Sequence, residues 1–174
     1  MTIGTRTVSS LISNGYELLL LAVMAGFAIY DYRHKRVPNK ALAFFLPIFL
    51  AAPFLRTAAQ GLPGILPALL NALFGAGAGF GILLLAALLS KGGAGVGGGD
   101  IKLFAAIGLC FGADGAVIVF ILTTLLSAAH FCILLMKKRI KVSERKPMVP
   151  YITVSSAIYL VILHEMSYNI MVSL

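Results

Sequence analysis

The chain has 174 residues, of which 60% are hydrophobic and only 11% are charged; its mean hydropathy is +0.99 and its formal net charge is +8. Soluble domains carry about 25% charged residues, and a chain this short cannot bury so much apolar surface in a water-soluble core. The composition therefore excludes an ordinary soluble protein. It predicts a single all-α membrane domain over residues 1–174, because helices satisfy their own backbone groups in lipid.

Six apolar stretches predict about six transmembrane helices. They lie at about residues 11–30, 41–55, 65–90, 101–111, 115–136 and 150–163. Spanning takes about 20 residues, so the first, third and fifth stretches are long enough. The second is short unless its flanks join it, and the last must extend toward Ser167. The fourth is the weakest, because Gly112-Ala113-Asp114-Gly115 interrupts it.

Basic residues gather in alternate connections between these stretches. Twelve of the fourteen Lys and Arg lie there: Arg33, Lys35, Arg36, Lys40, Lys91, Lys102, Lys137, Lys138, Arg139, Lys141, Arg145 and Lys146. The positive-inside rule predicts that these connections are cytoplasmic and that both termini are not. Because the charges are spread over short connections, they indicate topology anchors and not a nucleic-acid site. The run Lys137–Lys146 could contact anionic lipid headgroups of the bilayer.

Asp31 stands at the predicted cytoplasmic end of the first stretch. A carboxylate at a helix C-terminus opposes the helix dipole, so the position calls for an explanation. The plain one is a charge neutralised by Arg33, Lys35 or Arg36 at the interface. Pro38 favours an extended residue before it and the first turn of a helix after it. The segment therefore predicts a tight turn that could hold Asp31 in place.

Asp100 begins the fourth stretch, directly after Gly92–Gly99, in which six of the eight residues are glycine. An N-cap role would explain the aspartate alone, because its carboxylate accepts N–H groups at a helix start. It does not explain the glycines. Glycine permits close approach by another chain, so this loop could lie beside an extended substrate peptide.

The pairing of Asp31 and Asp100 is the feature that predicts chemistry. Two carboxylates on separate helices face the same predicted side of the membrane at similar depth. Two such groups about 3 Å apart share a proton, so that one activates water while the other polarises an amide carbonyl. This is the arrangement of an aspartic peptidase. No His pair or Glu-x-x-His spacing indicates a metal site, and no cofactor is expected.

Four glycines inside the third stretch have small-xxx-small spacing: Gly75/Gly79 and Gly77/Gly81. This spacing is typical of close packing between membrane helices, and we interpret it as structural.

The aspartate motifs resemble those of a known family. Gly97-Gly98-Gly99-Asp100 fits the G-x-G-D signature of intramembrane aspartic peptidases. The flanks resemble bacterial prepilin peptidases: Asp31-Tyr32-Arg33 followed by Val37-Pro38-Asn39, Gly99-Asp100-Ile101-Lys102-Leu103 followed by Ala105-Ala106-Ile107-Gly108, and later Pro147-Met148-Val149-Pro150-Tyr151.

This resemblance implies a peptidase of the bacterial inner membrane. It would cut the short basic leader from type IV pilin-like precursors, the prepilins, at the cytoplasmic membrane face. Asp31 and Asp100 match the catalytic aspartates, and Lys102 matches a frequent neighbour of the second one. Larger members also have a cysteine-rich zinc region and methylate the new N-terminus. This chain lacks paired Cys motifs and resembles the short, peptidase-only form of Tad/Flp-type pilus systems.

Three other functions stay open at this point. A transporter or channel subunit could use acidic residues as an ion path, although such groups are expected near the midplane and with internal repeats. A structural membrane subunit would use the two aspartates as a cap and an anchor. A peptidase of the presenilin or signal-peptide-peptidase type would place its Tyr-Asp motif deeper in a span than Tyr30-Asp31.

Overall fold

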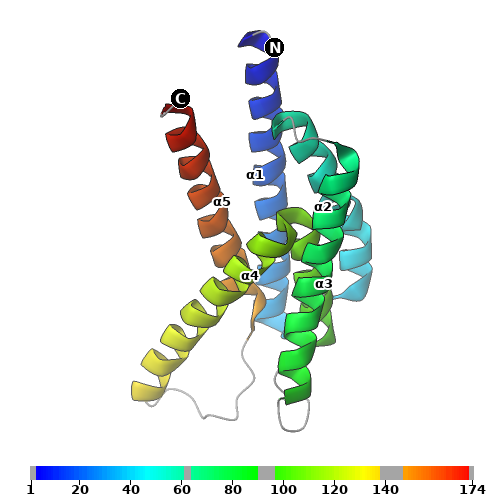
Figure 1. Ribbon diagram of the computed structural model, residues 1–174. Coiled ribbons are helices and arrows are strands. Elements are labelled where there is room, and N and C mark those ends of the chain that lie inside the picture. Colours follow the sequence, from blue (N-terminus) through cyan, green and yellow to red (C-terminus); the bar gives the residue numbers. More distant parts are fainter. Residues whose placement is uncertain (1–2, 61–63, 90–96, 138–146, 173–174) are drawn as a thin grey trace.

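A computed structural model describes residues 3–60, 64–89, 97–137 and 147–172 (Figure 1). It confirms the all-α prediction, since every regular element in these ranges is a helix. The helices are α1 (Ile3–His34), α2 (Asn39–Gln60), α3 (Ile65–Leu89), α4 (Gly98–Met136) and α5 (Val149–Val172).

Three of these helices contain segments long and apolar enough to cross a membrane: Leu11–His34, Ile65–Leu89 and Gly98–Met136. Two shorter apolar segments lie in α2 and α5, at Asn39–Leu55 and Val149–Glu165. Large apolar side chains cover the outside of the bundle, for example Phe44, Phe74 and Leu125. Lipid is the solvent that such a surface requires.

Helix α4 changes direction at Gly112, inside the interruption predicted from the sequence. Gly112 has φ 74° and ψ −176°, a backbone conformation that favours glycine. The residue after Gly112, Ala113, donates its N–H to the Asn71 side-chain oxygen on α3 at 3.3 Å. Residues 98–111 run beside α3, and residues 113–136 turn back along a separate path (Figure 1). The first part is about 21 Å long at 1.5 Å per residue, which is shorter than a bilayer core.

Glycines allow α3 and the first part of α4 to pack backbone against backbone. A Cβ atom on Gly75 would collide with the carbonyl oxygen of Gly108, and one on Gly79 would lie 2.6 Å from that of Phe104. These two positions confirm the packing predicted from their spacing. Gly77 and Gly81 do not share this role, because a Cβ atom there would meet nothing within 4 Å.

A residue of α4 replaces a hydrogen bond that a proline removes from α2. Pro53 has no N–H, so the carbonyl of Phe49, four residues earlier, loses its helical donor. The buried Cys110 thiol donates to this carbonyl at a sulfur–oxygen distance of 3.6 Å. The Tyr16 hydroxyl on α1 donates to the neighbouring Ile48 carbonyl at 2.9 Å. These contacts join the proline-containing part of α2 to α4 and α1.

The helix ends that flank the basic connections gather at one end of the molecule. Figure 1 shows that α1 and α3 end there, that α5 begins there, and that α4 both begins and ends there. The start of α1 and the end of α5 lie at the opposite end. Residues far apart in the sequence, including Asp31 and Asp100, are thereby brought to the same region.

Candidate active site

The turn between α1 and α2 is built from local signals in the sequence. Lys35 adopts φ 52°, the left-handed conformation that commonly ends a helix, and its N–H donates to the Asp31 carbonyl at 2.7 Å. Val37 is buried, and Pro38 follows it at the start of α2. This is the tight turn that the Pro38 motif predicted.

Asp31 lies at the C-terminal end of α1 and is anchored to another helix. Its side chain is only 2% exposed, and Oδ2 accepts the N–H of Val149, the first residue of α5, at 3.1 Å. The positive end of the α5 dipole therefore favours the carboxylate that the α1 dipole opposes. Sequence reasoning considered only the neighbouring Arg and Lys side chains and missed Val149. Pro150, in the first turn of α5, was the available sign of a helix start there.

Asp100 is the third residue of α4. Gly97 is the N-cap, and its N–H donates to Asp100 Oδ2 at 3.1 Å. This corrects the N-cap assignment considered from the sequence. Asp100 binds the N-cap residue from inside the helix, as the acidic member of a capping box does. Unlike Asp31, its side chain is half-buried.

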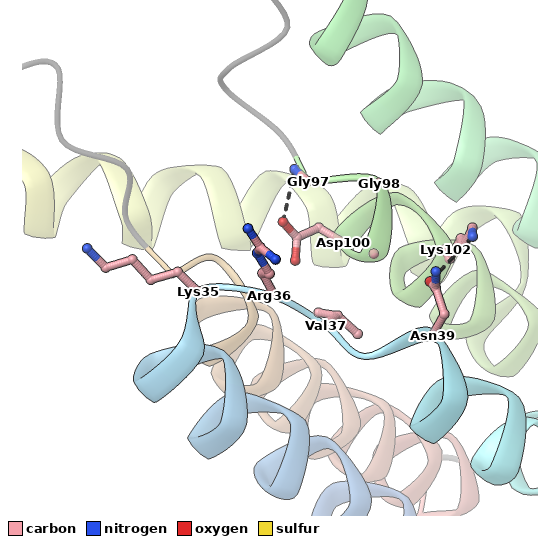
Figure 2. A pocket seen from close by; sticks show the side chains of 9 residues that line it. Lys35, Arg36, Val37, Asn39, Gly97, Gly98, Asp100 and Lys102 are labelled. Carbon is pink, nitrogen blue, oxygen red and sulfur yellow. Dashed lines mark hydrogen bonds between the residues drawn. The ribbon is translucent and has the colours of Figure 1, made fainter.

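A cavity of about 320 Å³ opens between the α1–α2 turn and the start of α4 (Figure 2). Its lining residues are Lys35, Arg36, Val37, Asn39, Gly97, Gly98, Gly99, Asp100 and Lys102. Arg36 points toward the Asp100 carboxylate, whereas Lys35 extends away from it (Figure 2). Lys102 Nζ donates to Asn39 Oδ1 at 3.3 Å and so connects α4 to the start of α2.

At Gly99 the cavity wall leaves no room for a side chain. A Cβ atom there would lie 2.7 Å from the Val37 carbonyl oxygen and 2.8 Å from the Val37 Cβ. At Gly98 the same atom would meet nothing within 4 Å. At Gly99 the segment that approaches closely is the α1–α2 turn of the same chain, and the approach of a substrate peptide to the glycine loop stays a prediction. The remainder of that loop, residues 92–96, lies outside the described residues.

The structure brings Asp100, Lys102 and the three glycines predicted from the sequence to one cavity. Asp31 is not among the lining residues; it is buried, and its carboxylate is bonded to the start of α5. In the described parts of the chain, no three His, Cys, Asp or Glu side chains gather closely enough to bind a metal ion. The basic run from Lys138 to Lys146 lies outside those parts.

Comparison with known proteins shows which family the chain belongs to. Residues 18–132 match the model of the type IV leader peptidase family. The chain belongs to that family. A curated relative, the "Prepilin leader peptidase/N-methyltransferase" of Bacillus subtilis (strain 168), is 31% identical over 139 residues. The alignment covers 80% of this chain and 52% of the relative, so the chain spans about half the relative's length. No solved structure matches.

Family membership confirms the resemblance inferred from the sequence motifs. The matched segment contains both Asp31 and Asp100, together with the turn of α1 into α2 and the cavity that this turn and the start of α4 line. Val149 and the rest of α5 lie beyond it. The family-defining part of the chain thus supplies both carboxylates, and α5 supplies the N–H group that holds one of them.

Proposed function

We propose that the chain is an aspartic endopeptidase that removes the leader peptide from prepilins, with Asp31 and Asp100 as the catalytic pair. The observation that carries this proposal is that both aspartates lie in the segment matched by the leader peptidase family, on helix ends gathered at one end of the bundle. Neither lies midway along its helix, where an ion path through the membrane would place them.

The chemistry assigned to the pair follows from sharing one proton. The ionised carboxylate accepts a proton from a water molecule as that water attacks the scissile carbonyl carbon. The protonated carboxyl group donates a hydrogen bond to the carbonyl oxygen, where negative charge develops. The proton is then passed to the leaving amine.

Asp100 is the carboxylate that substrate meets first. It lines the cavity, whereas Asp31 is buried and bonded to the start of α5. The cavity volume, about 320 Å³, is at the lower end of the range for ligand sites and suits a short extended segment. Catalysis then requires the substrate to draw Asp100 inward, so that both carboxylates face one peptide bond.

The remaining parts of the proposal concern substrate and location. We assign cleavage to the cytoplasmic face of a bacterial inner membrane, because the gathered helix ends flank the basic connections. We assign Flp-type prepilins as substrates, on the resemblance to the short peptidase-only form. We also propose that the chain crosses the membrane six times, with residues 98–111 as the shortest of the six spans.

Co-expression with a Flp-type prepilin carrying a C-terminal tag tests the proposal. Mass spectrometry of the purified pilin should show the loss of a mass equal to its leader when the wild-type chain is present. The loss should be absent with Asp31→Asn or Asp100→Asn at equal membrane abundance. Several Flp-type prepilins that all keep their full mass beside abundant wild-type protein would contradict the proposed function.

A further inference from the structure

One pair of polar side chains near the candidate site has no part in the chemistry described so far. His130 Nδ1 lies 2.6 Å from the Tyr151 hydroxyl, and the two ring centroids are 5.7 Å apart at 63°. His130 belongs to the returning part of α4, and Tyr151 is the third residue of α5. Neither lines the cavity.

The contact between His130 and Tyr151 attaches the first turn of α5 to α4. On one side, the turn is joined to α1, because Val149 donates to Asp31 and the Thr153 hydroxyl lies 3.2 Å from the Met24 carbonyl oxygen. On the other side, Tyr151 joins it to His130 on α4. The start of α5 is therefore fixed between two helices, and the Asp31 carboxylate is bonded to it.

We infer that His130 and Tyr151 are positioning residues for Asp31, acting through the N-terminus of α5. The geometry gives a direct route: the hydrogen bond sets where the first turn of α5 lies, and that turn presents the Val149 N–H to Asp31 Oδ2. A carboxylate needs a fixed orientation to act as a base, and small displacements lower the rate. This inference rests on the proposed peptidase function.

The expected effect is on turnover and not on substrate binding. Tyr151→Phe removes only the hydroxyl, and His130→Ala removes the ring. Each should lower kcat about 3- to 10-fold, the change expected from losing one hydrogen bond. KM should stay within about twofold, because no cavity residue is altered. The double variant should be no slower than the slower single variant, because both changes break the same contact.

Two further variants separate positioning from general damage. His130→Asn places an amide near the position of Nδ1 and should restore kcat to within about twofold of the wild-type value. Tyr159→Phe removes a hydroxyl from the same helix, far along α5 and beside Phe111, and should leave kcat unchanged. A contact that served only to stabilise the fold would lower the amount of folded protein without lowering kcat per folded molecule.

Hydrogen exchange of the purified protein in detergent gives a readout that needs no substrate. The amides of Val149, Tyr151 and Ile152 should exchange at least about threefold faster in Tyr151→Phe than in the wild type. Unchanged exchange, or a wild-type kcat in both single variants, would overturn the inference. A wild-type protein that cleaves no prepilin would count against the proposed function alone, because the exchange measurement would still decide whether the pair fixes α5.

Discussion

The two aspartates are held in contrasting ways, although both accept a backbone N–H at the start of a helix. Asp100 bonds to Gly97, three residues earlier, so its anchor is part of the same helical turn. Asp31 bonds to Val149, 118 residues later, so its anchor exists only in the folded bundle. Asp100 is half-buried beside a cavity, and Asp31 is buried and bonded to another helix.

This contrast suggests a division of roles within one catalytic pair. A local anchor can be broken and re-formed by one turn of helix, whereas a long-range anchor changes only when two helices move. We therefore expect Asp100 to adjust to the substrate while Asp31 provides the fixed reference. The following substitutions test that difference, beginning with the one of largest expected effect.

Replacing either carboxylate should remove most activity, whatever its anchor. Asp31→Asn and Asp100→Asn keep the side-chain shape and an acceptor oxygen, but neither can serve as a base. Each should lower prepilin cleavage about 10²- to 10⁴-fold, the usual contribution of a positioned acid or base. Initial rates on purified protein measure this. Near-normal cleavage by one variant would show that its aspartate is only an anchor.

Gly99→Ala should disturb the Asp100 region next most strongly. The added Cβ would lie 2.7 Å from the Val37 carbonyl oxygen, so the α1–α2 turn and the start of α4 must separate. We expect at least a tenfold loss of cleavage rate, because Asp100 is the next residue and moves with the helix start. Gly98→Ala is the matched control, since it meets nothing within 4 Å. Equal rates for the two variants would show that close packing at Gly99 is irrelevant to catalysis.

Removing each side chain should have unequal effects on stability. Asp31→Ala leaves the buried Val149 N–H without the carboxylate acceptor, which costs about 1–3 kcal/mol. Asp100→Ala removes a capping contact at a half-buried position, where the cost is about 1 kcal/mol and water can substitute. Thermal unfolding in detergent should therefore give a larger drop in Tm for Asp31→Ala. A larger drop for Asp100→Ala would reverse the proposed roles.

The smallest expected effect is at Lys102. Its hydrogen bond to Asn39 is exposed and 3.3 Å long, so Lys102→Met should change KM by no more than about threefold. Asn39→Ala should have the same effect, because it removes the other partner. A tenfold loss of kcat in Lys102→Met alone would show that this ammonium group acts on the reacting atoms, and not only on the cavity wall.

Local patterns were sufficient to predict several parts of this structure. The four residues Gly112–Gly115 marked the break in α4, and Pro38 marked the turn before α2. The glycine-aspartate motif predicted a helix start, although Gly97 and not Asp100 turned out to be the N-cap. Each of these features depends on residues within one or two helical turns, which is the range over which backbone preferences act.

Contacts between distant segments could not be predicted in the same way. Nothing near Asp31 in the sequence indicates that its partner is Val149, and nothing near Gly99 indicates Val37. The spacing of Gly75 and Gly79 predicted close packing but not the partner surface, which Gly108 and Phe104 provide. Such pairings depend on how whole helices pack, and in lipid many apolar faces fit one another about equally well.

The bend at Gly112 also determines whether the first and last residues of the bundle lie on the same side of the molecule. Five straight helices joined end to end would leave the first and last residues of the bundle on opposite sides. Because α4 folds back on itself, it contributes two helical segments of unequal length, and the start of α1 and the end of α5 lie on the same side of the molecule (Figure 1). A substitution that straightened this bend would carry the whole of α5 to the wrong side of the molecule, and Asp31 would then lose its partner.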